Sequence, residues 1–325
     1  MKTKQTAFLA ALLCLMSAAS CTKTAPQTFE NPVIRQDVPD PTVIRVGEDY
    51  YAAGTSGNAS QVYPMFHSRD LVHWDSVGHV FAEWPDWTMG SFWAPELFQN
   101  GDTFLCYYTA RDRSDSTSCI GVATAPSPTG PFTDRGPLVK WTNEAIDSYV
   151  FNDDGQLYIT WKAYGLNPER PIELLASRLS ADGLQLEGEP FSLLTDYEDL
   201  GMEGQCIFRH GKYYYLLYAA RDCCTERSDY EVRVARATRF QGPYEKYKGN
   251  PILRGDGEYI QSCGHGTLVQ TPGGKYYYLC HSYLIGRYKE GRQPILQELT
   301  IGNDGWPHFT TGDITVAEQP WPDIK

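Results

Sequence analysis

The sequence predicts an all-β fold, a five-bladed β-propeller, and three observations lead to this prediction. Helical periodicity is nearly absent after residue 30, where short apolar or aromatic runs alternate with turns rich in Gly, Asp and Asn. Five segments share one pattern, in which a polar or small residue precedes a short apolar strand, a Gly-containing turn and a second strand that usually carries Tyr. These segments start at residues 40, 94, 147, 203 and 264, so their starts lie 54, 53, 56 and 61 residues apart. Such a recurrence leaves room for about four strands per unit and is typical of propeller blades.

Each of the five segments is expected to form a β-hairpin. In chain order they are DPTVIRVGEDYYAAGTS, APELFQNGDTFLCYYTA, DSYVFNDDGQLYITWKA, EGQCIFRHGKYYYLLYAA and GHGTLVQTPGGKYYYLCHSY. Later parts of the units, such as HSRDLVHWDSVGHVF and ARATRFQGPYEKYKGNPIL, pair a small-residue strand with a turn and an outer strand. Because five units use up residues 31–325, we expect one propeller there and not two domains. A pair of β-sandwiches would explain the strands but not their recurrence.

The first 30 residues are typical of an export signal and a tether. Lys2 and Lys4 precede an apolar run at residues 7–16 that is too short to span a bilayer, so residues 1–20 are expected to be a signal peptide. The residues SAAS before Cys21 resemble a bacterial lipoprotein cleavage box, although Ala18 stands where Leu is usual. We therefore expect residues 21–30 to be a lipidated tether; an ordinary signal peptide with an incidental Cys21 is the alternative. The absence of acidic residues directly after Cys21 favours the periplasmic face over the cell surface.

The charge and the cysteines exclude some partners and site types. The formal net charge of −12 becomes −14 without the two signal-peptide lysines, and no basic cluster interrupts it. Nucleic acid is therefore not expected as a partner, and a membrane only through the lipid anchor. Of nine cysteines, seven follow the signal region, and none of them forms a metal-type CxxC pair. Cys106 and Cys119 are one candidate pair in an exported protein, but the odd number argues against a disulfide framework.

Three carboxylates stand at the starts of predicted inner strands. Asp40, Asp147 and Glu203 begin repeats one, three and four, and inner strands of a propeller run side by side around a central channel. We therefore expect them to meet at one channel mouth. Converging like charges raise at least one pKa, and an acid beside a carboxylate is the equipment that cleaves a glycosidic bond. Metal binding or strand capping by the same residues is the alternative.

The segments NPVIRQDVPDPTVIRVGEDYY, FWAPELFQNGDTFLCYY, IDSYVFNDDGQLYITW, MEGQCIFRHGKYYYLLY and GHGTLVQTPGGKYYYLCHSY resemble, in this order, glycoside hydrolase family 43. These are the inverting arabinofuranosidases, xylosidases and arabinanases, and the similarity covers about residues 31–306. The resemblance implies that Asp40 is the general base, that Glu203 is the general acid, and that Asp147 orients the acid and tunes its pKa. We expect Glu203 to be protonated before cleavage. Gln205 stands where the family often has Pro.

The resemblance also implies binding residues around the carboxylates. His265 begins the fifth inner strand, where relatives use a histidine to hold a central metal, often calcium, with waters completing the shell. A structural hydrogen bond is the alternative for His265, and His281 is a weaker metal candidate. Arg292 resembles the arginine that reaches the sugar pocket of the family, and a guanidinium there would hold a nearby carboxylate ionised.

Aromatic residues gather before the second inner strand, in EWPDWTMGSFWAPEL. Flat sugar faces stack on such rings, so Trp93, and less firmly Phe92, are expected to bind substrate. Glu96 is expected to have a structural role.

The sequence thus predicts an exo-acting inverting glycosidase that releases terminal L-arabinofuranose from plant polysaccharides or oligosaccharides. A β-D-xylosidase or a β-D-galactofuranosidase of the same family is the alternative; no C-terminal β-sandwich is evident after DGWPHF, which favours the arabinofuranosidase. A non-catalytic carbohydrate-binding propeller is the alternative from another class. The retaining invertase type is disfavoured, since its NDPNG and EC signatures are absent. The released sugar, its linkage and the oligomeric state are not fixed by the sequence.

Overall fold

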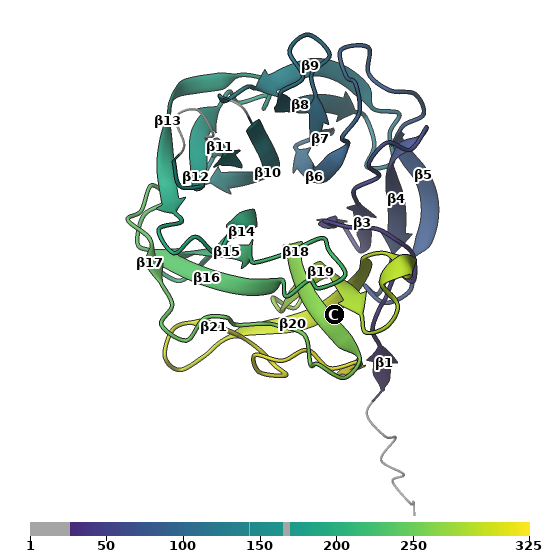
Figure 1. The fold of residues 1–325 in the computed structure, drawn as a ribbon, viewed down its shortest axis with the longest axis vertical. Coiled ribbons are helices and arrows are strands. Elements are labelled where there is room, and N and C mark those ends of the chain that lie inside the picture. Colours follow the sequence, from purple (N-terminus) through teal and green to yellow (C-terminus); the bar gives the residue numbers. More distant parts are fainter. Residues whose placement is uncertain (1–26, 143, 165–169) are drawn as a thin grey trace, which may run out of the picture.

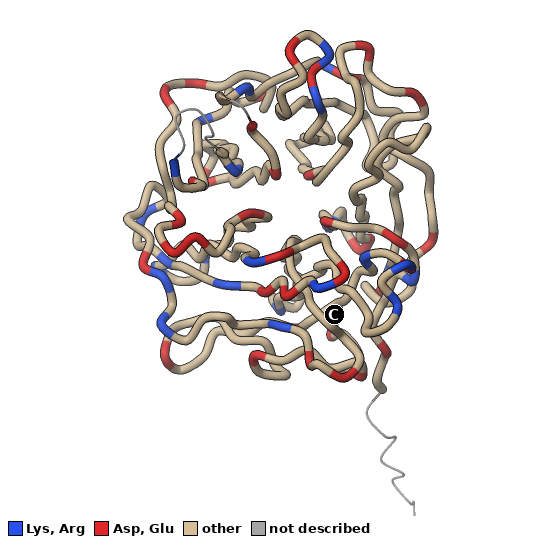
Figure 2. Tube along the Cα trace, viewed as in Figure 1, with Lys and Arg blue, Asp and Glu red and all other residues tan. Residues whose placement is uncertain are grey.

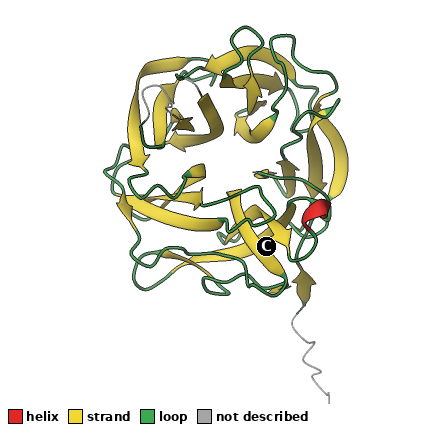
Figure 3. Cartoon of the chain, in the orientation of Figure 1, coloured by secondary structure: helices red, strands yellow, loops and turns green. Residues whose placement is uncertain are grey.

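The computed structural model describes residues 27–142, 144–164 and 170–325. Strands and loops make up almost all of this part, and its single helix is the short 3-10 helix η1 (Tyr288–Glu290) (Figure 3). The all-β prediction is therefore confirmed. Within the described ranges no helix has the length and apolarity needed to cross a membrane. The predicted signal peptide and most of the predicted tether lie outside the described residues.

Three sheets contain four strands each, hydrogen-bonded in chain order. The first consists of β2 (Thr42–Val46), β3 (Asp49–Ala53), β4 (Val62–Ser68) and β5 (Asp75–Phe81). The second consists of β14 (Glu203–His210), β15 (Tyr213–Ala220), β16 (Glu231–Ala237) and β17 (Glu245–Lys246). The third consists of β18 (Ile260–Gln270), β19 (Tyr276–Leu284), β20 (Gln293–Ile301) and β21 (Pro307–Phe309).

The remaining large sheet has eight strands and divides into two antiparallel groups of four. One group contains β6 (Trp93–Asn100), β7 (Thr103–Arg111), β8 (Ser118–Ala125) and β9 (Thr133–Val139). The other contains β10 (Glu144–Asp153), β11 (Gln156–Tyr164), β12 (Glu173–Leu179) and β13 (Leu186–Thr195). Only one parallel residue pair, Glu144 with Ser118, joins the groups in the register. The five predicted hairpins are present as β2–β3, β6–β7, β10–β11, β14–β15 and β18–β19.

The groups are arranged around a common centre, with β6, β10, β14 and β18 close to it (Figure 1). The first strands of the groups contact one another in the cyclic order β2, β6, β10, β14, β18 and back to β2. Apolar side chains pack between neighbouring groups; for example, Tyr215 and Val232 share one cluster with Tyr278 and Ile295. Acidic and basic positions are interspersed along the outer loops, as expected for a chain without a basic cluster (Figure 2). The core thus lies between sheets, and the ends of the first strands remain free to form a site.

The two ends of the described chain close this arrangement. β1 (Thr28–Glu30) pairs in antiparallel fashion with β22 (Glu318–Pro320). The buried Asn31 side chain donates a hydrogen bond to the carbonyl of Leu296 at 3.0 Å and accepts one from its N–H at 2.9 Å. The first described residues are therefore fixed to β20, a strand of the last group.

Each first strand has a residue with left-handed backbone close to its start. The φ angles are 52° at Asp40, 39° at Ala94, 57° at Asp147, 56° at Gly204 and 44° at His265. Register shifts typical of β-bulges fall at the same places in β6, β10, β14 and β18. Glu203 therefore stands one residue before the position equivalent to Asp40 and Asp147, so the predicted equivalence of the three carboxylates was wrong by one residue for Glu203.

The candidate disulfide between Cys106 and Cys119 is not formed. Cys106 and Cys119 are buried free thiols on the paired strands β7 and β8. They cannot bridge because the register places Cys106 opposite Ala123, and Cys119 opposite Ala110. A disulfide instead joins the adjacent residues Cys223 and Cys224.

Candidate active site

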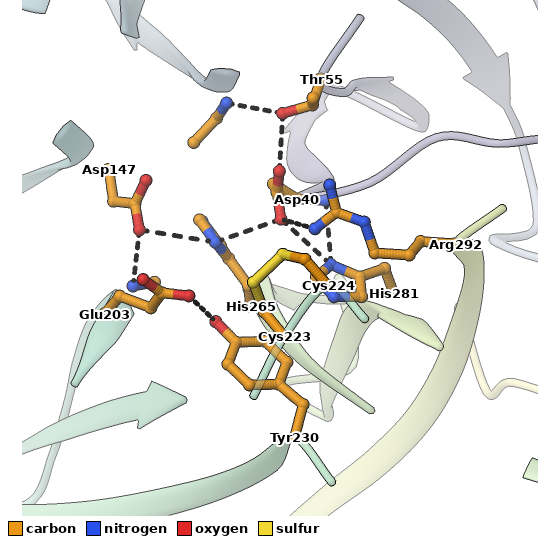
Figure 4. Close-up of polar contacts among 12 residues, drawn as sticks. Asp40, Thr55, Asp147, Glu203, Cys223, Cys224, Tyr230, His265, His281 and Arg292 are labelled. Carbon is orange, nitrogen blue, oxygen red and sulfur yellow. Dashed lines mark hydrogen bonds and ion pairs between the residues drawn. A yellow bond between two sulfur atoms is a disulfide. The ribbon is translucent and has the colours of Figure 1, made fainter. Parts of the chain in front are cut away.

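The starts of the first strands surround a cavity of about 360 Å³. Figure 4 shows Asp40, Asp147 and Glu203 around a common space. The structure brings together six residues that were predicted from the sequence, namely Asp40, Trp93, Asp147, Glu203, His265 and Arg292, and adds Ile146, Cys223 and Cys224 to the lining. A wider cavity of about 660 Å³ shares Trp93, Cys224 and Arg292 with this one. The three carboxylates therefore lie in a small chamber that opens beside a larger one.

Asp40 is held as a carboxylate by the groups around it. Its Oδ2 accepts a hydrogen bond from the Thr55 hydroxyl at 2.6 Å. Its Oδ1 lies 3.1 Å from Nη1 of Arg292 and 3.3 Å from Nδ1 of His265. Burial would raise the pKa of Asp40, but the Arg292 guanidinium and the nearby His265 ring outweigh this effect and hold the pKa well below its usual range. Asp40 is thus ready to accept a proton near neutral pH.

His281 supports Asp40 from the backbone side. The N–H of Asp40 donates to Nδ1 of His281 at 3.0 Å, so this nitrogen carries no proton. Burial and the charge of Arg292 lower the pKa of His281 to about 4, in agreement with a neutral ring. The 3.2 Å contact between the same Nδ1 and Asp40 Oδ1 is therefore not an ion pair.

His265 lies between two of the carboxylates. Its Nδ1 is 3.3 Å from Asp40 Oδ1 and 3.7 Å from Asp147 Oδ2 (Figure 4). A direct calcium cage would need six or more oxygen ligands, and the described residues contain no group of three or more His, Cys, Asp or Glu side chains that could hold a metal. The donors of the described residues thus do not fit a directly coordinated calcium ion. A calcium ion completed by waters stays a prediction.

Asp147 is positioned by the two residues that follow Glu203. The N–H of Gly204 donates to Asp147 Oδ2 at 3.2 Å. The buried Gln205 donates its side-chain amide to the Asp147 carbonyl and, at 3.1 Å, to the Thr160 hydroxyl. Gln205, where the family often has Pro, therefore fixes the backbone at the left-handed Asp147.

Glu203 is paired with a cation that the sequence reasoning missed. Its Oε2 lies 2.6 Å from Nζ of Lys162, on β11, and its Oε1 accepts a hydrogen bond from the Tyr230 hydroxyl at 2.8 Å. Burial would raise the pKa of Glu203, but the Lys162 ammonium lowers it below its ordinary value. The expectation that Glu203 is protonated before cleavage was therefore wrong for the substrate-free site.

Asp147 is the carboxylate that holds a proton more readily. Burial raises its pKa, His265 opposes this effect, and the negative charge of Glu203 adds to it, so that the pKa rises to about 6. Because the two carboxylates influence one another, their titration belongs to the pair. The Asp147–Glu203 pair can thus carry one proton in mildly acidic solution, and this proton resides mainly on Asp147.

Two aromatic residues were predicted to bind substrate, and only one of them lines the cavity. Trp93 is partly exposed and lines both cavities. Phe92 is fully buried, and its ring packs edge-on against Tyr63 at 5.9 Å and Trp84 at 5.1 Å. The substrate-binding prediction for Phe92 was therefore wrong: residues 92 and 93 point to opposite sides of the chain, and Phe92 points into the core. Glu96 is buried and accepts a hydrogen bond from Thr42 at 2.8 Å, which agrees with the structural role predicted for it.

Several site residues carry no signal in the sequence. Lys162 lies on β11, inside the third recurring segment, but no lysine stands at the matching position of the other four segments. Tyr230 lies directly before β16 and outside the five segments. Thr55 follows β3 and is visible only as part of a GTS turn. The Cys223–Cys224 dipeptide could have drawn attention, because adjacent cysteines are unusual, but its place at the cavity depends on a loop path that only the structure shows.

Comparisons with known proteins show the family and the fold of this chain. The model of glycosyl hydrolases family 43 matches residues 29–307. A xylan 1,3-beta-xylosidase of Vibrio sp. is 30% identical over 91% of this chain and 61% of its own, and a non-reducing end alpha-L-arabinofuranosidase of Bacteroides ovatus is 28% identical over 92% and 57%. The chain thus spans about 60% of the length of these curated relatives. The crystal structure of a thermostable family-43 glycoside hydrolase superposes with a TM-score of 0.80, with 26% identity over 91% of this chain and 99% of the other. Because the family model matches most of this chain, the chain belongs to glycosyl hydrolases family 43.

Proposed function

We propose that this chain is an exo-acting, inverting glycosidase that removes terminal L-arabinofuranose from plant polysaccharides or oligosaccharides. The observation that carries the proposal is the convergence of Asp40, Asp147 and Glu203 in one small cavity, each in a different electrostatic environment. A chamber of about 360 Å³ lies at the lower end of the range of ligand pockets, which suits one terminal sugar better than an internal stretch of chain. Residues 31–325 then form one five-bladed propeller, with each four-stranded group as a blade and the site at one mouth of its channel.

In the proposed reaction Asp40 is the general base. Arg292 and His265 keep it ionised, so that it accepts a proton from the attacking water. Asp40, two residues before β2, and Glu203, at the start of β14, belong to different four-stranded groups, an arrangement compatible with the separation that an inverting reaction needs to admit a water.

Glu203 is the proposed acid, and the pair that it forms with Asp147 supplies the proton. In the free site the proton resides mainly on Asp147. For Glu203 to act as the acid, this proton must pass to Glu203 before the leaving oxygen departs. The Gly204 N–H that contacts Asp147 Oδ2 and the Tyr230 hydroxyl that contacts Glu203 Oε1 keep both carboxyl groups oriented for this exchange.

The test compares leaving groups. Glu203→Gln should suppress hydrolysis strongly, but less for an aryl glycoside with an acidic phenol, which needs little protonation; Asp40→Asn should affect both substrate types similarly. Proton NMR of the first-formed sugar should show inversion. The proposal is wrong if the purified chain cleaves no arabinofuranoside, xyloside, galactofuranoside or polysaccharide fragment. The opposite leaving-group pattern would mean that Asp40 is the acid and Glu203 is the base.

A β-D-xylosidase is the second candidate, because the more identical of the two curated relatives described above is a xylosidase. A panel of aryl α-L-arabinofuranoside, β-D-xyloside and β-D-galactofuranoside decides by the ratio of kcat/KM values. A non-catalytic sugar-binding propeller would bind such ligands and release no phenol.

We further propose that the chain is exported and anchored to a membrane through a lipid on Cys21, at the periplasmic face. Support comes from the sequence of residues 1–21 alone. Cys21→Ala should move the protein from the membrane fraction to the soluble fraction, and an unchanged distribution would contradict the anchor.

A further inference from the structure

The disulfide between the adjacent residues Cys223 and Cys224 lies in the loop between β15 and β16. The five other cysteines of the described residues are buried free thiols, whereas Cys224 is exposed and Cys223 is half-buried. Figure 4 shows the disulfide beside His265 and Arg292. The only oxidised cysteines of the described part are thus those that face the proposed site.

The disulfide lies at the boundary between the two cavities. Cys223 and Cys224 line the chamber that contains the three carboxylates, and Cys224 also lines the wider cavity. Trp93 and Arg292 are the other residues common to both linings. A sugar chain whose terminal unit occupies the small chamber would have to pass between Cys224, Trp93 and Arg292.

The loop around the disulfide is fixed from two sides. The Asp222 carboxylate accepts a hydrogen bond from the Cys224 N–H at 3.1 Å. The Cys224 carbonyl accepts hydrogen bonds from the hydroxyls of Tyr288 at 3.1 Å and Tyr283 at 3.4 Å. These tyrosines belong to η1 and β19, so the disulfide is held against the sheet that carries His265.

We propose that the Cys223–Cys224 disulfide is a specificity-determining wall that contacts the sugar unit attached to the terminal one. A disulfide presents polarizable sulfur and carbon atoms without a strong hydrogen-bond donor, which suits the apolar C–H face of a sugar opposite the Trp93 ring. Reduction by a dithiol transfers two electrons and two protons to the S–S bond and oxidises the dithiol to its own disulfide. The two resulting thiols rotate independently, so the wall loses its shape. This inference rests on the proposed function for the identity of the ligand.

Binding in a non-cleaving background tests the wall separately from catalysis. Isothermal titration calorimetry would compare Glu203→Gln with the triple variant Glu203→Gln/Cys223→Ala/Cys224→Ala, using an arabinose disaccharide, a xylose disaccharide and the free monosaccharides. We expect the Kd of the bound disaccharide to rise about tenfold, equivalent to ~1.4 kcal/mol, and that of its monosaccharide to change less. Reduction of Glu203→Gln with dithiothreitol should weaken disaccharide binding in the same way, and the triple variant should not respond to dithiothreitol.

Two controls keep the result interpretable. The triple variant should retain the circular dichroism spectrum and a melting transition, and Cys119→Ala, a change at a buried thiol away from both cavities, should leave the disaccharide Kd unchanged. An unchanged disaccharide Kd in the triple variant would overturn the wall, as would an equal loss for disaccharide and monosaccharide. Binding that depends on the disulfide in a chain whose wild type cleaves no glycoside would support the wall and overturn the proposed hydrolase.

Discussion

Lys162 is the residue whose charge most directly controls the proposed acid. Its Nζ lies 2.6 Å from Glu203, and its own pKa is raised by Glu203 and Asp147 against the effect of burial. A cation at this distance favours the ionised carboxylate and so opposes proton storage on Glu203.

Lys162→Met should therefore shift the alkaline limb of the kcat/KM profile to higher pH. Without the ammonium group the pKa of Glu203 rises, and the Asp147–Glu203 pair keeps its proton to a higher pH. The pH dependence of kcat/KM for an aryl glycoside measures this shift. Lys140→Met removes a cation paired with Asp112, outside the cavity lining, and should leave the profile unchanged. A shift of the limb to lower pH would contradict the assignment of Lys162.

The neighbours Phe92 and Trp93 should respond to truncation in opposite ways. Trp93→Ala should raise KM with little change in melting temperature, because Trp93 is a partly exposed wall of both cavities. Phe92→Ala should lower the free energy of unfolding by about 3–5 kcal/mol, the usual cost of deleting a buried aromatic ring. Denaturant unfolding and steady-state kinetics on both variants separate the effects. If Phe92→Ala were as stable as the wild type and had a raised KM, Phe92 would be a substrate-binding residue and this prediction would be wrong.

The three carboxylates of the proposed site could be found from the sequence, whereas their protonation could not. Asp40, Asp147 and Glu203 open recurring segments, and the resemblance of these segments to family 43 implies roles for the same three residues. The pKa directions depend on Lys162, which is 41 residues from Glu203, and no lysine stands at the matching position of the other four recurring segments. Which carboxylate holds the proton is thus decided by contacts between strands that a linear pattern does not show.

At the scale of elements, the β-bulges place the functional side chains. The left-handed residue near the start of each first strand turns the chain so that consecutive side chains can face the cavity, as Ile146 and Asp147 do. Backbone strain of this kind is frequent at functional sites. The sequence predicts the hairpins from their turns and tyrosines, but the prediction was one residue off at Glu203, because the conspicuous charge stands one residue before the left-handed Gly204.

Gly204→Ala should lower activity more than its backbone strain alone explains. A Cβ on Gly204, whose φ is 56°, would lie 2.5 Å from Cγ of His265, so the imidazole between Asp40 and Asp147 would have to move. The left-handed conformation itself costs a non-glycine residue roughly 1–2 kcal/mol.

Gly211→Ala is the matched control, since Gly211 has a φ of 59° and a Cβ added there would meet no atom within 4 Å. Both variants should lose stability through the backbone strain, Gly204→Ala more because of the added contact with His265, and only Gly204→Ala should lose kcat/KM by about tenfold or more. Equal kinetics in the two variants would show that the position of His265 is not critical.

At the scale of the whole molecule, the recurrence of residues predicts the ring but not its closure. The five hairpins follow from the spacing, and the contacts of the first strands run in a closed cycle. The pairing of β1 with β22 joins segments almost 300 residues apart, and neither TFE nor EQP carries a strand pattern of its own. Such short edge strands are specified by the partner that they meet, which sequence-local reasoning does not see.

Asn31→Ala tests whether this closure holds the molecule together. The Asn31 side chain satisfies both backbone groups of the buried Leu296, and leaving them unpaired should cost about 2–4 kcal/mol of unfolding free energy. Asn250→Ala removes an equivalent pair of hydrogen bonds, which join the loop after β17 to the backbone of Val234 on β16. Hydrogen exchange should therefore accelerate in β1, β20 and β22 for Asn31→Ala, and in β16 for Asn250→Ala. If β22 keeps its protection in Asn31→Ala, the strand pairing of the two chain ends closes the ring without the help of Asn31.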